Sequence, residues 1–129
     1  MEQYRPEGFS TVTPYLIVRG ADKLIDFLKM AFGAEEKLRV PTEDGKIMHA
    51  EVRIGDSAVE LADANERYGP MPASLHIYVP DCDSAYARAI KAGGKSISEP
   101  ADQSYGERSG GVLDPLGNQW WIATLTIAR

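Results

Sequence analysis

The chain has 129 residues, of which 43% are hydrophobic, enough to bury the core of one domain. Its 14 Lys and Arg against 19 Asp and Glu give a formal net charge of −5, and no basic cluster occurs, which argues against a nucleic-acid partner. A single cysteine excludes an internal disulfide, which favours a reducing compartment. The chain shows neither a membrane-length apolar run nor a signal peptide. We therefore expect a cytoplasmic protein without a membrane partner.

The first half of the chain predicts a polar arm at residues 1–9, followed by one helix and four strands. Apolar residues recur at helical spacing over residues 22–32, and Gly33 is a typical helix stop. Alternating or continuous apolar patterns predict strands at residues 11–18, 35–42, 47–54 and 58–62. Asp44-Gly45 and Gly55-Asp56 supply tight turns between the last three strands.

The second half repeats this order after a Gly- and Pro-containing linker at residues 63–72. A helix is expected at residues 81–92, with Cys82 on its buried face. Strands are expected at residues 74–79, 95–99, 108–113 and 119–125. Gly110-Gly111 lies inside one of these strands and indicates a bulge.

An internal repeat connects the two halves. Sliding the chain against itself by 61 residues places residues 16–22 on residues 77–83 and Gly33 on Gly94. A unit present only twice does not form a solenoid. We therefore predict a single α+β domain over residues 1–129, built from two βαβββ modules in tandem, with the two sheets facing to form a central cleft. Module 1 covers about residues 10–62 and module 2 about residues 73–126.

This pattern resembles the vicinal oxygen chelate superfamily, which includes glyoxalase I, extradiol dioxygenases and bleomycin-resistance proteins. The likeness covers residues 10–126 and is closest to the PhnB-like subgroup. It is carried by four segments: Pro14-Tyr15-Leu16, the helix from Ile25-Asp26-Phe27 to Phe32-Gly33-Ala34, Met48-His49-Ala50-Glu51, and Asp114-Pro115-Leu116-Gly117-Asn118-Gln119-Trp120.

The resemblance implies where a metal would be bound. Superfamily enzymes hold a divalent metal on the first and last strands of each module, and these positions here are Thr13, Glu60, Ser74 and Trp121. Only Glu60 is a competent ligand, because neutral hydroxyls bind such metals poorly and an indole does not bind them. We therefore expect no metal at the family positions, and no cofactor.

A different polar site is predicted from strand alternation. It places His49, Glu51, Glu60 and His76 on the pocket side and Met48, Ala50, Val52 and Ile54 towards the helix. If Gly55-Asp56 is a two-residue turn, Glu51 lies opposite Glu60. Two facing carboxylates repel, so either one is protonated or a cation sits between them, and Arg53, a metal or a cationic ligand could be that cation. The alternative to a functional site is that Glu51 and Glu60 form a structural ion pair with Arg53 along the sheet.

Aromatic residues add a second component to the predicted pocket. Trp120 and Trp121 point to opposite faces of their strand, Trp120 into the core and Trp121 into the pocket. Tyr15 and Tyr78 are expected on the pocket face, where rings can stack on a planar or cationic ligand. The alternative to ligand stacking is that Trp121 only fills the cavity.

Three functions follow from these residues. The first is metal-free binding of a small aromatic or cationic molecule by the ligand-binding set Tyr15, His49, Glu51, Glu60, His76, Tyr78 and Trp121, with Glu51 and Glu60 as the candidates for acid/base chemistry. The alternative is a metal-dependent lyase, isomerase or dioxygenase that holds Zn, Fe, Ni or Mn on His49, Glu60 and His76. The third is a structural or partner-binding domain. The resemblance also implies a homodimer, with the cleft completed by the partner or by exchange of a module.

Overall fold

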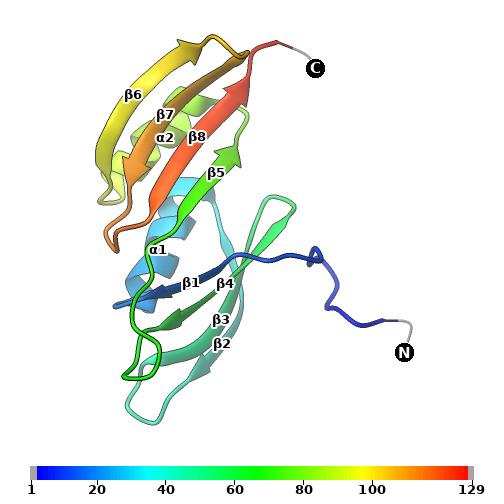
Figure 1. The fold of residues 1–129 in the computed structure, drawn as a ribbon, viewed down its shortest axis with the longest axis vertical. Coiled ribbons are helices and arrows are strands. Elements are labelled where there is room, and N and C mark those ends of the chain that lie inside the picture. The colour runs from blue at the N-terminus through cyan, green and yellow to red at the C-terminus, as the bar shows by residue number, and fades with distance from the viewer. Residues whose placement is uncertain (1–2, 128–129) are drawn as a thin grey trace.

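Two four-stranded sheets, each with one helix, make up the computed structural model, which describes residues 3–127 (Figure 1). The first sheet has the order β1-β4-β3-β2 and the second β5-β8-β7-β6. The pairs β1–β4 and β5–β8 are parallel, and the other neighbours are antiparallel. In chain order the elements are β1 (Tyr15–Val18), α1 (Ala21–Phe32), β2 (Glu35–Pro41), β3 (Ile47–Ile54), β4 (Ser57–Asp63), β5 (Ser74–Tyr78), α2 (Cys82–Lys91), β6 (Lys95–Gln103), β7 (Glu107–Leu113) and β8 (Gln119–Leu125). The predicted α+β fold of tandem βαβββ modules is confirmed.

Both helices begin and end where the sequence supplies the right chemistry. Helix α1 ends at Gly33, whose positive φ of 66° lets its backbone N–H turn back to the carbonyls of the last turn. Helix α2 begins after Asp81, whose side chain accepts a hydrogen bond from the N–H of Ser84. Helix α1 presents a nearly continuous buried stripe: Ala21, Leu24, Ile25, Phe27, Leu28 and Ala31.

The two modules share one hydrophobic core, in which α1 and α2 pack against each other. Trp120 of β8 is 2% exposed, and its ring centroid is 5.2 Å from that of Phe32 at the end of α1. Its predicted place in the core is therefore confirmed. Cys82 is also buried, as predicted. Among residues 3–127, neither helix has the length and apolarity that crossing a bilayer requires.

Three sequence expectations differ from the structure. Strand β1 begins at Tyr15 rather than at residue 11. Met48 does not face the helix: it is 58% exposed, because the register between β2 and β3 skips it and Ile47 takes the buried position instead. Gly110 marks a bulge as expected, but the extra residue lies on the partner strand β6, between Ser98 and Ala101. Residues 1 and 2 of the predicted arm lie outside the described residues.

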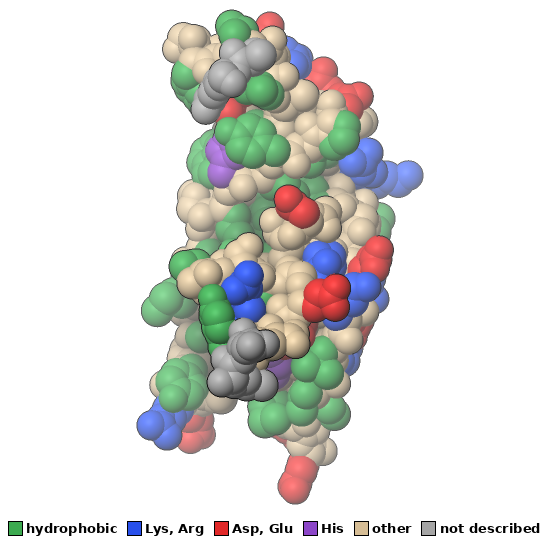
Figure 2. Space-filling model, turned by 90° about the vertical axis from the view of Figure 1, so that its right-hand side faces the viewer, with side chains coloured by type: hydrophobic (Ala, Val, Ile, Leu, Met, Phe, Trp, Pro, Cys, Tyr) green, Lys and Arg blue, Asp and Glu red, His purple; other side chains and the backbone are tan. Residues whose placement is uncertain are grey.

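Each sheet carries its helix on one face and leaves the other face uncovered by a helix. We call these uncovered sides the first face, on β1–β4, and the second face, on β5–β8. On the side of the molecule shown in Figure 2, hydrophobic side chains gather in separate groups over the two modules, with acidic and basic side chains mixed between them. The predicted site residues are distributed over these two faces.

Candidate functional site

The centre of the first face is a pair of carboxylates on neighbouring strands. Ile54 pairs with Ser57 across the two-residue turn, and this register places Glu51 directly opposite Glu60. The facing pair is therefore confirmed. Their side chains keep 20% and 25% of their surface exposed, so both carboxylates can be reached from solvent.

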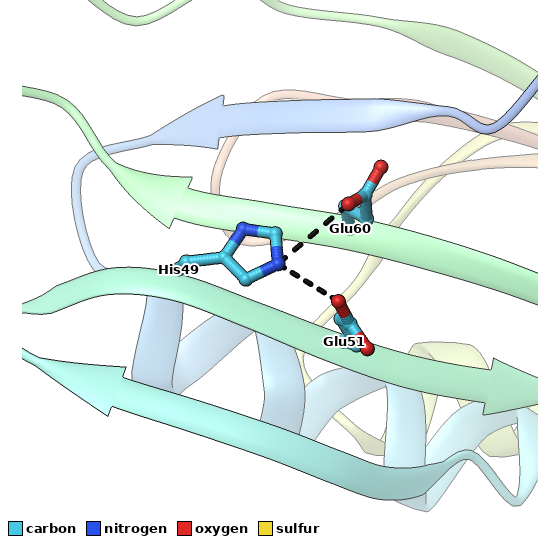
Figure 3. A group of neighbouring side chains, drawn as sticks. All are labelled: His49, Glu51 and Glu60. Carbon is cyan, nitrogen blue, oxygen red and sulfur yellow. Dashed lines mark hydrogen bonds and ion pairs between the residues drawn. The ribbon is translucent and has the colours of Figure 1, made fainter. Parts of the chain in front are cut away.

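His49 lies between these two carboxylates (Figure 3). Its Nε2 is 3.0 Å from Oε2 of Glu51 and 3.6 Å from Oε1 of Glu60. All three residues offer one ligand atom within 4.8 Å of the others. The imidazole, rather than Arg53, occupies the position between the two negative charges.

Arg53 does not bridge the pair as one alternative expected. Its Nη2 is 3.5 Å from the backbone carbonyl of Glu7, and its guanidinium packs so closely on Gly8 that a Cβ there would overlap it. Arg53, which lies two cross-strand pairs nearer the turn than Glu51 and Glu60, is thus engaged by the N-terminal arm. This leaves His49 as the basic group paired with Glu51 and Glu60 among the described residues.

Tyr15 contacts the second ring nitrogen of His49, Nδ1. Its hydroxyl oxygen is 3.2 Å from Nδ1 of His49, and its ring centroid is 5.7 Å from that of His49. Burial, reinforced by the negative charge of Glu60, raises the pKa of Tyr15, so its hydroxyl keeps its hydrogen. When Tyr15 donates that hydrogen to Nδ1, the ring hydrogen lies on Nε2 and is directed at Glu51.

A cavity of about 960 Å³ adjoins this group on the first face. It lies where the linker returns along β1, as the backbone pairing of Met71 with Ile17 records. Its lining comes from residues 15–69 alone, so it does not lie between the two sheets, where a central cleft was predicted. Tyr15 belongs both to the lining and to the His49 group. The lining residues used below are Tyr15, Ile17, Met48, Asp63 and Tyr68.

The remaining predicted site residues lie on the second face. His76 is bonded there to Glu107, with 3.0 Å between Nε2 and Oε2, and Tyr78 donates to the same carboxylate. The alternative metal set of His49, Glu60 and His76 is thus not brought together within this chain. Among residues 3–127, the metal-binding distances are met by His49, Glu51 and Glu60.

The four family metal positions do not form a donor set that fits a metal. Thr13 precedes β1 and donates its hydroxyl hydrogen towards the carbonyl of Ser10. Trp121 donates its indole N–H to the hydroxyl oxygen of Ser74 at 2.9 Å, so two of the positions are bonded to each other. A carboxylate, two engaged hydroxyls and an indole lack the imidazoles or thiolates that bind transition metals well.

Sequence reasoning missed two carboxylates that have several hydrogen-bond partners, Glu107 and Asp63. Glu107 was not identified because its strand was expected to begin at residue 108. Asp63 was assigned to the linker, but it ends β4 and accepts hydrogen bonds from three backbone N–H groups. The available signal for Asp63 was a carboxylate directly after an apolar strand, whereas its contact with the start of α1 is visible only in the structure. Nothing local marked Glu107.

Cys82 lacks the features of a reactive thiol. Burial, with the neighbouring negative charge of Asp83, raises its pKa, and its Sγ donates to the carbonyl of Ile122 at 3.2 Å. A buried thiol held in its neutral form is a weak nucleophile. The structure therefore supports the structural role expected for this residue.

Comparison with known proteins agrees with the fold. Residues 9–122 match the model of the Glyoxalase/Bleomycin resistance protein/Dioxygenase superfamily. The uncharacterized protein Rv0887c of Mycobacterium tuberculosis is 37% identical over 120 residues, covering 84% of this chain and 71% of its own length. TioX from Micromonospora sp. ML1 has a similar structure, with a TM-score of 0.77, 26% identity and coverage of 90% of this chain and 98% of its own. The PhnB protein of Bacillus cereus shares the fold, with a TM-score of 0.72, 16% identity, and coverage of 89% and 99%.

Proposed function

Because this chain belongs to the glyoxalase/bleomycin resistance protein/dioxygenase superfamily, whose fold hosts many chemistries, we propose its function from its own site: stoichiometric binding of a small molecule with a cationic group and an aromatic body. The observation that carries this proposal is the facing pair of Glu51 and Glu60, which has one imidazole but no Lys or Arg as partner among the described residues.

The charge balance of the pair favours a cationic ligand. Two carboxylates opposite each other on adjacent strands repel, and a single imidazole carries at most one positive charge against the two. A positive group placed over the pair would interact with both charges at once. Since the carboxylates are partly exposed, each interaction contributes about 1 kcal/mol or less.

The neighbouring surface suits the rest of such a molecule. Tyr15 and Tyr68 offer aromatic rings, and Ile17 and Met48 offer apolar contacts within the same cavity. Aromatic rings attract both planar and cationic groups, and methionine adapts to ligands of irregular shape. The ligand's charge would then lie at Glu51 and Glu60, with its ring extending past Tyr15 into the cavity.

A fluorescence titration with berberine, a planar aromatic cation, tests this proposal. We expect saturable binding at one site, weakened about two- to fivefold in Glu60→Gln, since one charge interaction is lost. Glu99→Gln is the matched control, because it removes the same charge from an exposed position of β6 in the other module. Equal affinities of the two variants, or equally tight binding of the anionic dye anilinonaphthalene sulfonate, would contradict the proposal.

A second candidate function is favoured by the distances within the same group. An imidazole and two carboxylates with ligand atoms within 4.8 Å of one another match the donor types of zinc, iron, nickel or manganese sites. Tyr15 would then accept a hydrogen from Nδ1 of His49 and orient its Nε2 towards the ion. A metal held there would supply Lewis-acid chemistry.

Elemental analysis separates the two candidates. About one equivalent of a transition metal per chain in protein purified without chelator, lost in His49→Gln and in Glu60→Gln, would establish the metal site. A metal content near zero, unchanged after incubation with each ion and dialysis, would eliminate the metal candidate and leave the cationic ligand as the proposal.

A further inference from the structure

A buried carboxylate on the second face has no part in the function proposed above. Glu107, at the start of β7, is only 2% exposed. Its Oε2 is 3.0 Å from Nε2 of His76, and its Oε1 accepts a hydrogen bond from the hydroxyl of Tyr78 at 3.3 Å. The rings of His76 and Tyr78 lie with their centroids 4.7 Å apart.

The strand order explains how these side chains meet. Strand β8 lies between β5, which carries His76 and Tyr78, and β7, which carries Glu107. The side chains of β5 and β7 therefore meet across the face of β8. Tyr78 is paired with Ala123 of β8, and this small residue is 0% exposed, as expected for a residue covered by the crossing side chains. A larger residue there would block the crossing.

This arrangement fixes the histidine ring. A buried carboxylate is costly unless it is hydrogen-bonded, and Nε2 of His76 and the hydroxyl of Tyr78 supply hydrogen bonds to Glu107. Nε2 therefore carries a hydrogen directed at Glu107, which leaves Nδ1 with a lone pair in the neutral ring. Within residues 3–127 no hydrogen bond engages Nδ1, and the His76 side chain is 41% exposed.

An apolar hollow of about 600 Å³ adjoins Tyr78, whose ring in turn lies against that of His76. It is lined by Tyr78, Val79, Pro80, Thr124 and Leu125, and both Tyr78 and Leu125 are largely exposed. Tyr78 thus joins the hollow to the Glu107 carboxylate, as Tyr15 joins the cavity of the first face to His49.

We propose that the second face carries a separate binding site for phenols, in which Nδ1 of His76 accepts a hydrogen bond from the phenolic hydroxyl and the apolar hollow receives the ring. Glu107 is the positioning residue, because it holds His76 in the tautomer whose Nδ1 is an acceptor. An ether in place of the hydroxyl has no hydrogen to donate, so the site distinguishes a phenol from its methyl ether.

Equilibrium dialysis with p-cresol and 4-methylanisole tests the site. Wild-type protein is expected to bind p-cresol at least about tenfold more tightly than its methyl ether. His76→Gln should remove this preference, while His49→Gln and Glu60→Gln on the first face should keep it. Equal binding of the two probes, or a preference that survives in His76→Gln, would overturn the proposal.

Glu107→Gln tests the positioning role, since an amide can donate a hydrogen to Nε2 and so favour the other tautomer. The preference for p-cresol should fall in this variant while the far-ultraviolet circular dichroism stays that of the wild type. Ala123→Leu provides a second test that keeps the carboxylate: by blocking the crossing, it should lower the same preference. An unchanged preference in folded samples of both variants would exclude Glu107 as the positioning residue. Because Glu60→Gln tests the first face independently, failure of one site is distinguishable from failure of the other.

Discussion

Single residues with several backbone partners hold the first face in place, and Asp63 is the clearest of them. Its Oδ1 accepts from the N–H groups of Gly20 and Ala21 at the start of α1, each at 2.9 Å, and its Oδ2 accepts from Ile47 at 2.8 Å. One carboxylate therefore joins the end of β4, the first turn of the helix and the start of β3. It also lines the cavity on the first face.

The ionisation of Asp63 predicts an acid-dependent loss of stability. Burial alone would raise its pKa, but the backbone N–H groups of Ala21, Ile47 and Gly20 outweigh burial and hold the pKa below its ordinary value. A carboxyl with a lowered folded-state pKa stabilises the protein above its unfolded-state pKa, and this contribution is lost as the pH falls through the folded-state pKa.

Asp63→Asn should lower the free energy of unfolding at neutral pH by about 1–3 kcal/mol, because one acceptor oxygen is replaced by an amide that faces an N–H group. Urea unfolding across a pH series measures both effects. The difference between wild type and variant should shrink as the pH is lowered below the ordinary carboxyl range. A difference that stays constant with pH would show that ionisation of Asp63 does not contribute.

At the scale of elements, the two modules share one architecture but carry different side chains on their uncovered faces. Gly111 pairs with Trp121 in the second sheet as Glu51 pairs with Glu60 in the first. Where the first module has two carboxylates, the second has an indole ring lying over a glycine. A Cβ added at Gly111 would lie 2.5 Å from Cζ3 of Trp121, so this position accommodates the ring only while it lacks a side chain.

Gly111→Ala is therefore expected to displace the indole and break its hydrogen bond to Ser74. Overpacking of this kind destabilises by about 1–3 kcal/mol, and a shift of the tryptophan emission should accompany a lower melting temperature. Gly69→Ala is the control, because a Cβ there meets nothing within 4 Å. Equal melting temperatures and unchanged emission in both variants would show that Trp121 does not depend on Gly111.

Those features of the two faces that depend on residues close together in the sequence are predictable from the sequence. The two-residue turn at Gly55-Asp56 sets the register that makes Glu51 face Glu60, and strand alternation sends Trp120 and Trp121 to opposite sides. The direction of a long side chain depends on more distant neighbours. Arg53 was one of the candidates for the cation between the carboxylates, but the N-terminal arm, more than forty residues away in sequence, engages it instead.

The contacts that span strands were less predictable. The skipped pairing of Met48 results from a register shift between Val40 and Pro41, inside β2, which the Asp44-Gly45 turn motif does not reveal. The bond from His76 to Glu107 joins the two strands on either side of β8, and no local sequence pattern indicates such a pairing. Sequence alternation assigned His49 and His76 to pocket-facing sides, but only the arrangement of the two sheets separates them.

On the scale of the whole molecule, both sheets leave one face uncovered by a helix. Tyr15 on the first face and Tyr78 and Leu125 on the second are largely exposed. Exposed apolar groups beside polar clusters are typical of ligand sites and of protein interfaces. The homodimer expected from the family resemblance remains our prediction, with a partner completing one or both faces.

Sedimentation equilibrium at micromolar concentration checks this prediction. A mass twice that of the chain is expected, with Tyr78→Ser and Leu125→Ser shifting the equilibrium towards the monomer if the second face is the interface. A monomer mass across the concentration range would contradict dimerisation, and each site would then be formed by one chain.

The most direct test of the central claim is to locate a cationic aromatic ligand on the protein. Amide chemical shifts should be followed by nuclear magnetic resonance during a titration with berberine. Changes are expected around Tyr15, His49 and Glu60, on β1, β3 and β4, and should weaken in Glu60→Gln. Shift changes confined to the second face, or changes that persist undiminished in Glu60→Gln, would contradict the assignment of the facing carboxylates as the ligand site.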